Sequence, residues 1–273
     1  MNDQQDFDTK AAFNITKIKN VNRHITTCDN FNKFMGTEGE TPALISSALV
    51  QKTDKGSGVK VTIKTPQNIT KVTTLQYQNA AITAGASDVN IDIASPIPVT
   101  GESALVGVSK ALTANGVKVD QNRAEVANKE LATTANIADA NKENKEFDAV
   151  ALDLAMTQIK TGLAKYKQEN GKVADNAKIT EIVNTALKDK GLDKIITPEQ
   201  VQQLVSFADA YQNTSAIDSK EVAQQLENYA KSAYDSLSDK YKQFINSDEA
   251  HGMLESIGSF FGNLWKAIVN MFS

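Results

Sequence analysis

The sequence predicts an α+β protein, with a small β-β-α-β-α sheet domain followed by an all-helical C-terminal region. Two observations support this fold class. Between about residues 43 and 95, apolar residues alternate with polar ones in short stretches, as in strands with one buried face. From about residue 117 they recur every three to four residues instead, as on the buried face of a helix. Hydrophobic residues make up 41% and charged residues 23% of the chain, which is typical of a globular protein.

Two strands are expected first, at residues 43–52 and 59–65. In the second, valine and isoleucine alternate with lysine and threonine, which predicts one buried and one wet face. The loop between them, residues 54–58, carries two glycines and is typical of a β-hairpin. We therefore expect these two strands to pair, with a third strand beside them and helices covering one face.

The next stretch predicts a helix at residues 74–84 and a strand at 89–95. Gly85 stands where a helix favours a left-handed residue, which glycine adopts without steric cost. Pro96 and Pro98 end the strand because proline cannot donate to a sheet ladder. A second helix follows, with apolar positions Ala104, Leu105, Val108 and Leu112 and with Thr100 or Ser103 as its expected cap.

Two stretches of this region resemble a known family. They are ISSALVQKTDKGSGVKV (45–61) and YQNAAITAGASDVNIDIASPIPVTGESALVGVSKAL (77–112). Together they resemble the secreted Gram-positive proteins grouped as domain of unknown function 1002. We place the resemblance over about residues 43–135, more loosely through the C-terminal helices, and not over 1–40. It implies export and an α+β domain, and it implies no catalytic residue.

The remaining chain predicts a series of helices. Asp120 precedes the first, a long one ends near Asn170-Gly171, and a third ends shortly before Gly191. Thr197, Pro198 and Gln200 have the spacing of a capping box, and a further long helix is expected at 219–245. The predicted organisation is a weakly structured leader at 1–40, an α+β domain at 41–116, a helical region at 117–247 and an amphipathic C-terminal helix at 248–273.

Composition excludes several classes of function. The net charge of −4, without a basic run, argues against nucleic-acid binding. The single cysteine, Cys28, forms no intramolecular disulfide, and His24 four residues before it lacks further ligands, so we expect no metal and no cofactor. No signal-peptide pattern opens the chain. Given the resemblance, we expect a secreted or cell-surface protein whose signal is not present in this chain.

The turn before the helix at residue 103 is the candidate ligand-binding site, formed by Thr100, Gly101 and Ser103. A helix N-terminus exposes N–H donors to an anion or polar ligand, although Glu102 already places a carboxylate there. The turn resembles a nucleophile elbow, but Leu105 stands where that motif needs glycine, and both histidines are far away in sequence. We therefore predict no catalytic residue.

The last segment has an apolar stripe at helical spacing, interrupted by few charges. The candidate contact residues are Leu254, Ile257, Phe261, Leu264, Trp265 and Ile268. Three interpretations remain open. The helix lies on a membrane surface or another envelope component, docks on a partner or on its own domain, or is an ordinary packed terminal helix.

These observations favour an exported, non-catalytic binding or structural protein of the Gram-positive cell envelope. One alternative is a hydrolase of envelope polymers, whose carboxylates the sequence does not single out. Another is a membrane-surface protein anchored by its C-terminal helix.

Overall fold

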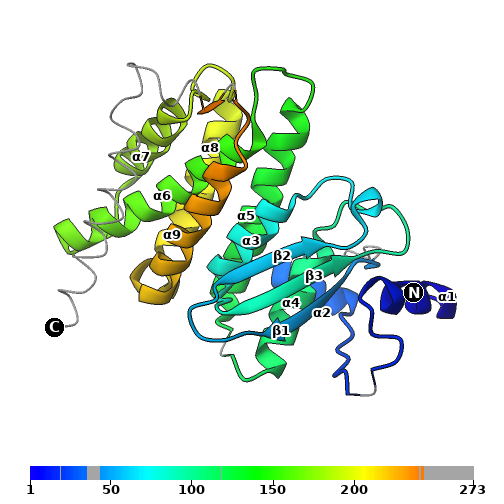
Figure 1. Ribbon diagram of the computed structural model, residues 1–273. Coiled ribbons are helices and arrows are strands. Elements are labelled where there is room, and N and C mark those ends of the chain that lie inside the picture. Colours follow the sequence, from blue (N-terminus) through cyan, green and yellow to red (C-terminus); the bar gives the residue numbers. More distant parts are fainter. Residues whose placement is uncertain (19, 36–43, 118, 240, 243–273) are drawn as a thin grey trace. The chain divides into compact units, whose positions relative to one another are not determined.

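Figure 1 shows a computed structural model of the protein, which describes residues 1–18, 20–35, 44–117, 119–239 and 241–242. The chain divides into two compact units, Met1–Ala135 and Asn136–Ser273. The first unit holds a three-stranded sheet, and the described part of the second is helical. The predicted α+β fold with a helical C-terminal region is therefore confirmed. None of the helices in the described ranges is long and apolar enough to cross a membrane.

Two helices lie within residues 1–40, the segment interpreted from sequence as a weakly structured leader. They are α1 (Asp3–Ala12) and α2 (Cys28–Met35). The capping box of α1 is formed by Asn2 and Gln5, whose side chains and backbone N–H groups bond reciprocally. α2 lies against α4 (Ser103–Ala114) of the same unit.

The sheet has the strand order β1-β3-β2, formed by β1 (Ser47–Lys52), β3 (Val89–Ala94) and β2 (Val59–Ile63). β3 is central, antiparallel to β1 and parallel to β2. The predicted hairpin between the first two strands is therefore wrong, although all three strands form where alternation predicts them.

The loop that suggested a hairpin is held by the start of β3 instead. The Asp88 carboxylate accepts hydrogen bonds from the backbone N–H groups of Gly56 (3.0 Å) and Gly58 (2.9 Å). Because Asp88 directly precedes β3, these bonds bring the central strand to the loop. The loop thus leads the chain across β3 to its far side.

Two helices cover one face of the sheet, as predicted. α3 (Thr74–Ala84) packs against β2, and α4 packs against β1, and both lie behind the strands in Figure 1. The covered face carries apolar residues from all three strands, which are paired in register as Val50, Ile91 and Val61, whereas Leu49 pairs with Asp92 on the opposite face. The opposite face holds exposed lysines and half-buried Asn90 and Asp92, so it is the wet face. The single turn η1 (Pro66–Asn68) joins β2 to α3.

The helices downstream begin and end near the predicted positions. They are α5 (Gln121–Asn141), α6 (Ala149–Asn170), α7 (Asn176–Asp189), α8 (Pro198–Gln212), the short η2 (Ser215–Asp218) and α9 (Lys220–Asp235). α6 is central to the second unit and contacts α7, α8, η2 and α9. The predicted capping box at Thr197 and Gln200 is present, and Gly171 ends α6 in the left-handed conformation.

One predicted helix is shorter than expected. The pattern at 219–245 indicates a single helix, but α9 ends at Asp235, with Ser236 as its C-cap. The chain then turns, and Leu237 is buried. The backbone N–H of Ser238 donates a 3.4 Å hydrogen bond to the Asp148 carboxylate. Apolar spacing continues through this turn, so periodicity alone could not reveal it.

Candidate functional site

Gly101, one of the predicted ligand residues, is locked by contacts inside its own unit. Its backbone has φ +108°, and a Cβ placed there would lie 2.5 Å from Tyr77 Oη and 2.9 Å from Ile69 Cγ2. The Tyr77 hydroxyl donates a 2.5 Å hydrogen bond to the Gly101 carbonyl. Burial, with the negative charge of Glu102 adding to it, raises the pKa of Tyr77, so the hydroxyl remains a donor. The turn therefore requires glycine for packing reasons.

Ser103 and Thr100 do not cap α4, contrary to the prediction. Glu102 is the N-cap residue, in helical conformation and without a side-chain capping bond. The Ser103 hydroxyl lies 2.6 Å from that of Ser46, which precedes β1, and Thr100 Oγ1 donates to Glu102 Oε2 at 2.5 Å. Each hydroxyl therefore bonds to another side chain, and neither caps the helix.

The charge at this turn is also compensated. The Lys71 ammonium lies 3.1 Å from Glu102 Oε1, in an ion pair that is largely shielded from water. The hydroxyl next to Ser103 belongs to another serine, which is not a base that could activate it. The structure thus brings Thr100, Gly101 and Ser103 together in one polar turn, whose groups bond to Glu102, Tyr77 and Ser46 respectively. A ligand role for these three residues stays a prediction.

The second set of predicted contact residues, from Leu254 to Ile268, lies outside the described residues. Within the described ranges, no group of three or more His, Cys, Asp or Glu side chains is placed to hold a metal ion.

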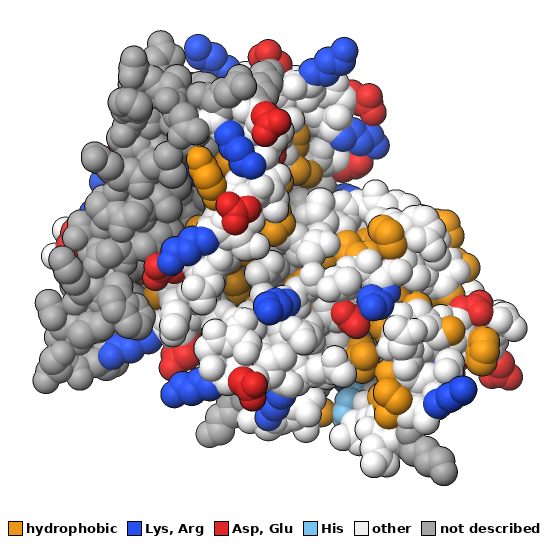
Figure 2. Space-filling model, in the orientation of Figure 1, with side chains coloured by type: hydrophobic (Ala, Val, Ile, Leu, Met, Phe, Trp, Pro, Cys, Tyr) orange, Lys and Arg blue, Asp and Glu red, His pale blue; other side chains and the backbone are white. Residues whose placement is uncertain are grey.

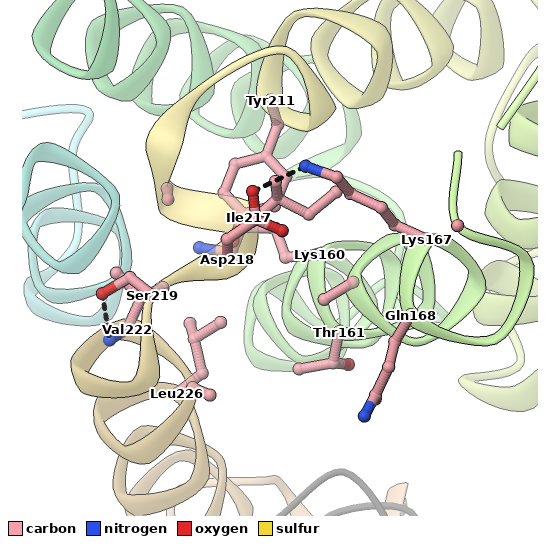
Figure 3. Close-up of a pocket in the computed structure, with 14 residues that line it drawn as sticks. Lys160, Thr161, Lys167, Gln168, Tyr211, Ile217, Asp218, Ser219, Val222 and Leu226 are labelled. Carbon is pink, nitrogen blue, oxygen red and sulfur yellow. Dashed lines mark hydrogen bonds and ion pairs between the residues drawn. The ribbon is translucent and has the colours of Figure 1, made fainter. Parts of the chain in front are cut away.

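A cavity that sequence analysis did not predict lies in the helical unit (Figure 3). Its volume is about 310 Å³, at the lower end of the range of about 300–1,000 Å³ for small-molecule pockets. It lies between α6, the end of α8, η2 and the first turns of α9. The polar and charged residues that line it are Lys160, Thr161, Lys167, Gln168, Tyr211, Asp218 and Ser219.

Short side chains on facing elements leave this space open. Ala164 and Gly171 lie on α6 and at its end, while Ala216 and Ala223 lie on η2 and α9. The cavity-lining positions of α6 recur at 160, 164, 167 and 171, which is one helix face. Those of α9 and its cap recur at 219, 222, 223 and 226, again one face.

The inner wall is largely apolar but contains one buried cation. Ile217, Val222 and Leu226 are buried and contribute aliphatic surface. Lys160 is 0% exposed, and its Nζ lies 5.9 Å from the ring centroid of Tyr211, within cation–π range. This wall can accept an apolar body while keeping a positive charge nearby.

An ion pair lies at one end of the cavity. Lys167 Nζ on α6 is 2.6 Å from Asp218 Oδ2 at the end of η2, and the two side chains are 30% and 53% exposed. Local caps hold the η2 segment in place. The Thr214 hydroxyl accepts from the Ala216 N–H at 3.2 Å, and the Ser219 hydroxyl caps α9 by accepting from the Val222 N–H at 3.3 Å.

The cavity was missed because it combines two stretches of the chain, residues 160–171 and 211–226, that are about 40 positions apart in the sequence. One local signal was present, since Lys160 and Lys167 stand seven residues apart and so share a face of the predicted long helix. Alone, that spacing is also typical of a solvated face. Only the position of η2 and α9 shows that this helix face lines a cavity and is not simply solvated.

The fold defines an α+β protein with a helical C-terminal unit, and comparisons place it in a family. The model described as "Protein of unknown function (DUF1002)" matches residues 1–229, so the chain belongs to that family. The match begins at residue 1, so the placement of the resemblance outside residues 1–40 is wrong. It also includes every residue that lines the cavity.

A curated relative supports the same assignment. The chain is similar to the uncharacterized protein YpuA of Bacillus subtilis (strain 168), with 34% identity over 230 residues. The similarity covers 84% of this chain and 71% of that protein. No solved structure shows a significant match.

Proposed function

We propose that this is an exported, non-catalytic binding protein of the Gram-positive cell envelope, and that it binds a small molecule in the cavity of its helical unit. The observation that carries the binding role is the cavity itself. It has the volume of a small-molecule pocket, aliphatic walls and a few placed polar groups.

The lining residues favour binding over hydrolysis. A glycosidase-type site needs two carboxylates on either side of the bond that is cleaved. Among the described residues that line the cavity, Asp218 is the one carboxylate, and it is paired with Lys167. A polymer hydrolase would therefore need a different site from this one.

Family membership supports the proposed location. The chain resembles secreted Gram-positive proteins over its sheet domain, and its relative YpuA comes from a Gram-positive organism, Bacillus subtilis. Cell fractionation of the native host tests this part. Most of the protein in the cytosolic fraction would contradict export, whatever the cavity binds.

A neutral fluorescent probe tests the binding role. We expect N-phenyl-1-naphthylamine, an apolar probe that brightens away from water, to bind the full chain with saturation. Ala223→Leu and Ala164→Leu each insert a larger side chain into the cavity from a half-buried helix position, and each should abolish most of this binding. Gln224→Leu adds an apolar side chain at the exposed neighbouring position of α9 and should leave binding unchanged.

The comparison of these variants decides the outcome. Equal probe binding by Ala223→Leu, Ala164→Leu and the original chain, with unchanged circular dichroism, would contradict a binding role for the cavity. Loss of binding in Gln224→Leu as well would place the probe elsewhere on α9 and would contradict it equally.

A further inference from the structure

The two edges of the sheet are protected to different degrees. Because β3 is central, β1 and β2 are the edge strands (Figure 1). Edge strands expose unpaired backbone groups, and proteins block them with charged side chains or covering segments. On β2, the Gln78 side chain of α3 donates a 2.7 Å hydrogen bond to the Val59 carbonyl, and exposed Lys60 carries a charge within the strand. Both features hinder the addition of a further strand to β2.

The backbone of β1 has unpaired groups along its outer side. The Thr53 N–H, one residue beyond β1, donates a 2.9 Å hydrogen bond to the Asp88 carbonyl, one residue before β3. Successive residues of a strand direct their N–H and C=O groups to opposite sides. Those of Ala48, Val50 and Lys52 therefore point away from β3. In the part of the chain that the structure describes, no hydrogen bond from another segment reaches these backbone groups.

The side chains of β1 do not block this edge. The strand, SALVQK, contains no proline, and its one charged residue is Lys52 at the end. The Lys52 ammonium donates a 2.6 Å hydrogen bond to the Asn115 carbonyl, so its charge lies against its own unit. Leu49 is an apolar residue on the wet face, where it pairs with Asp92 in the ladder. A further strand beside β1 would shield the Leu49 side chain from water.

β1 is complementary to a second copy of itself. In an antiparallel pair, the outward groups of one strand must bond to outward groups of the other. A two-fold axis through Leu49 meets this condition, because it sets Ala48 opposite Val50 of the second copy. The two Leu49 side chains then lie together on the wet face, and the lysine at the strand end faces Ser46, so like charges do not meet. An axis through Val50 would instead set Leu49 opposite polar Gln51.

From this arrangement we propose that the protein forms a two-fold symmetric dimer through β1. The two β1 strands pair antiparallel about Leu49, and the sheets of both copies join into one. The same surface patch serves both copies, as in most homodimers. Because one short strand from each copy forms the contact, the dimer exchanges with the monomer and its population rises with protein concentration.

Sedimentation equilibrium of the full chain over a range of concentrations tests the dimer. Leu49→Lys should weaken it by about tenfold or more, because two ammonium groups would meet at the axis. The fold should be retained, since the new lysine pairs with Asp92 in the ladder. Thr62→Lys is the matched control. Exposed Thr62 pairs with the same Asp92 from the other edge strand, so this variant should dimerise like the original chain.

These variants also give the results that would overturn the proposal. A monomer at every concentration would overturn it, as would a dimer that Leu49→Lys leaves unchanged. Equal weakening by Thr62→Lys and Leu49→Lys would show that added charge on either edge has the same effect, and would overturn the assignment to β1. Circular dichroism of each variant verifies that the fold is retained.

Cysteine cross-linking tests the register, in a Cys28→Ser background that removes the native thiol. In the proposed dimer the two residues at position 49 form a non-hydrogen-bonded pair, with Cα atoms about 4.5 Å apart, which suits a disulfide. Leu49→Cys should therefore give a covalent dimer on mild oxidation. Gln51→Cys on the same face should not, because it faces Ser47, and the two cysteines lie roughly 14 Å apart. Equal cross-linking of both variants, or none of Leu49→Cys, would overturn the pairing.

Discussion

At the scale of single residues, Gly101 is required by its surroundings. We expect Gly101→Ala to lower the free energy of unfolding by about 2–5 kcal/mol, because a Cβ at φ +108° is strained and would meet Tyr77 Oη at 2.5 Å. Gly116→Ala is the matched control, since Gly116 also has positive φ, +81°, but open space around it. It should cost only about 1 kcal/mol. Urea denaturation measures both, and equal losses would show that the contact with Tyr77 is unimportant.

Lys190 gives the protein a specific dependence on pH. Its side chain is 1% exposed, and its Nζ donates a 2.5 Å hydrogen bond to Gln158 Oε1. Burial lowers the pKa of Lys190 to about 8, although the nearby Asp189 carboxylate opposes this shift. Between pH 8 and about 10.5, the unfolded chain binds more protons at this site than the folded one. The free energy of unfolding therefore rises with pH across that window, because the cost of burying the charged Lys190 ammonium disappears. This gain is lost again as the pH falls to 8.

The variant Lys190→Met isolates this contribution. The difference in unfolding free energy between the original chain and the variant should shift in favour of the original chain by on the order of 3 kcal/mol from pH 7 to pH 10.5. Urea denaturation of both proteins across that range measures it. A difference independent of pH would contradict the lowered pKa of Lys190.

At the scale of elements, the strands were predictable and their order was not. Alternation at residues 59–63 and 89–94 shows which side chains face inward, because the side-chain period of a strand is two. It carries no information on which strand is the neighbour. The bonds from Gly56 and Gly58 to Asp88 decide that, and they join residues about 30 positions apart. Helix ends were more predictable, because caps such as Thr197 act within a few residues.

The central position of β3 has a measurable consequence. Ile91 pairs with β1 on one side and β2 on the other and is 1% exposed, so Ile91→Ala should lower the free energy of unfolding by about 2–5 kcal/mol. Val50→Ala truncates its half-buried partner on the edge strand β1 and should cost about 1 kcal/mol. Comparable losses in the two variants, measured by urea denaturation, would argue against β3 as the buried centre.

At the scale of the whole molecule, the sequence predicts the fold class better than the site. The change from alternation to helical spacing near residue 117 appears as a sheet-bearing unit and a helical unit. The cavity lies where α6, η2 and α9 face each other, and short side chains such as Ala164 and Ala223 leave it open. An alanine on a helix is common, and its role becomes visible only when the facing element is known.

The terminal segment 248–273 supplies the last prediction, because its apolar stripe suggests contact with a membrane surface. An amphipathic helix, which the sequence of this segment predicts, binds bilayers through its buried apolar area, and the segment carries few charges beyond Glu255 and Lys266. We expect the full chain to co-sediment with phosphatidylcholine vesicles, and a chain ending at Asp248 to remain in the supernatant. Because the segment lacks a basic face, phosphatidylglycerol should add little. Trp265→Ala should weaken the binding of the full chain, and equal sedimentation of the full and shortened chains would rule out the anchor.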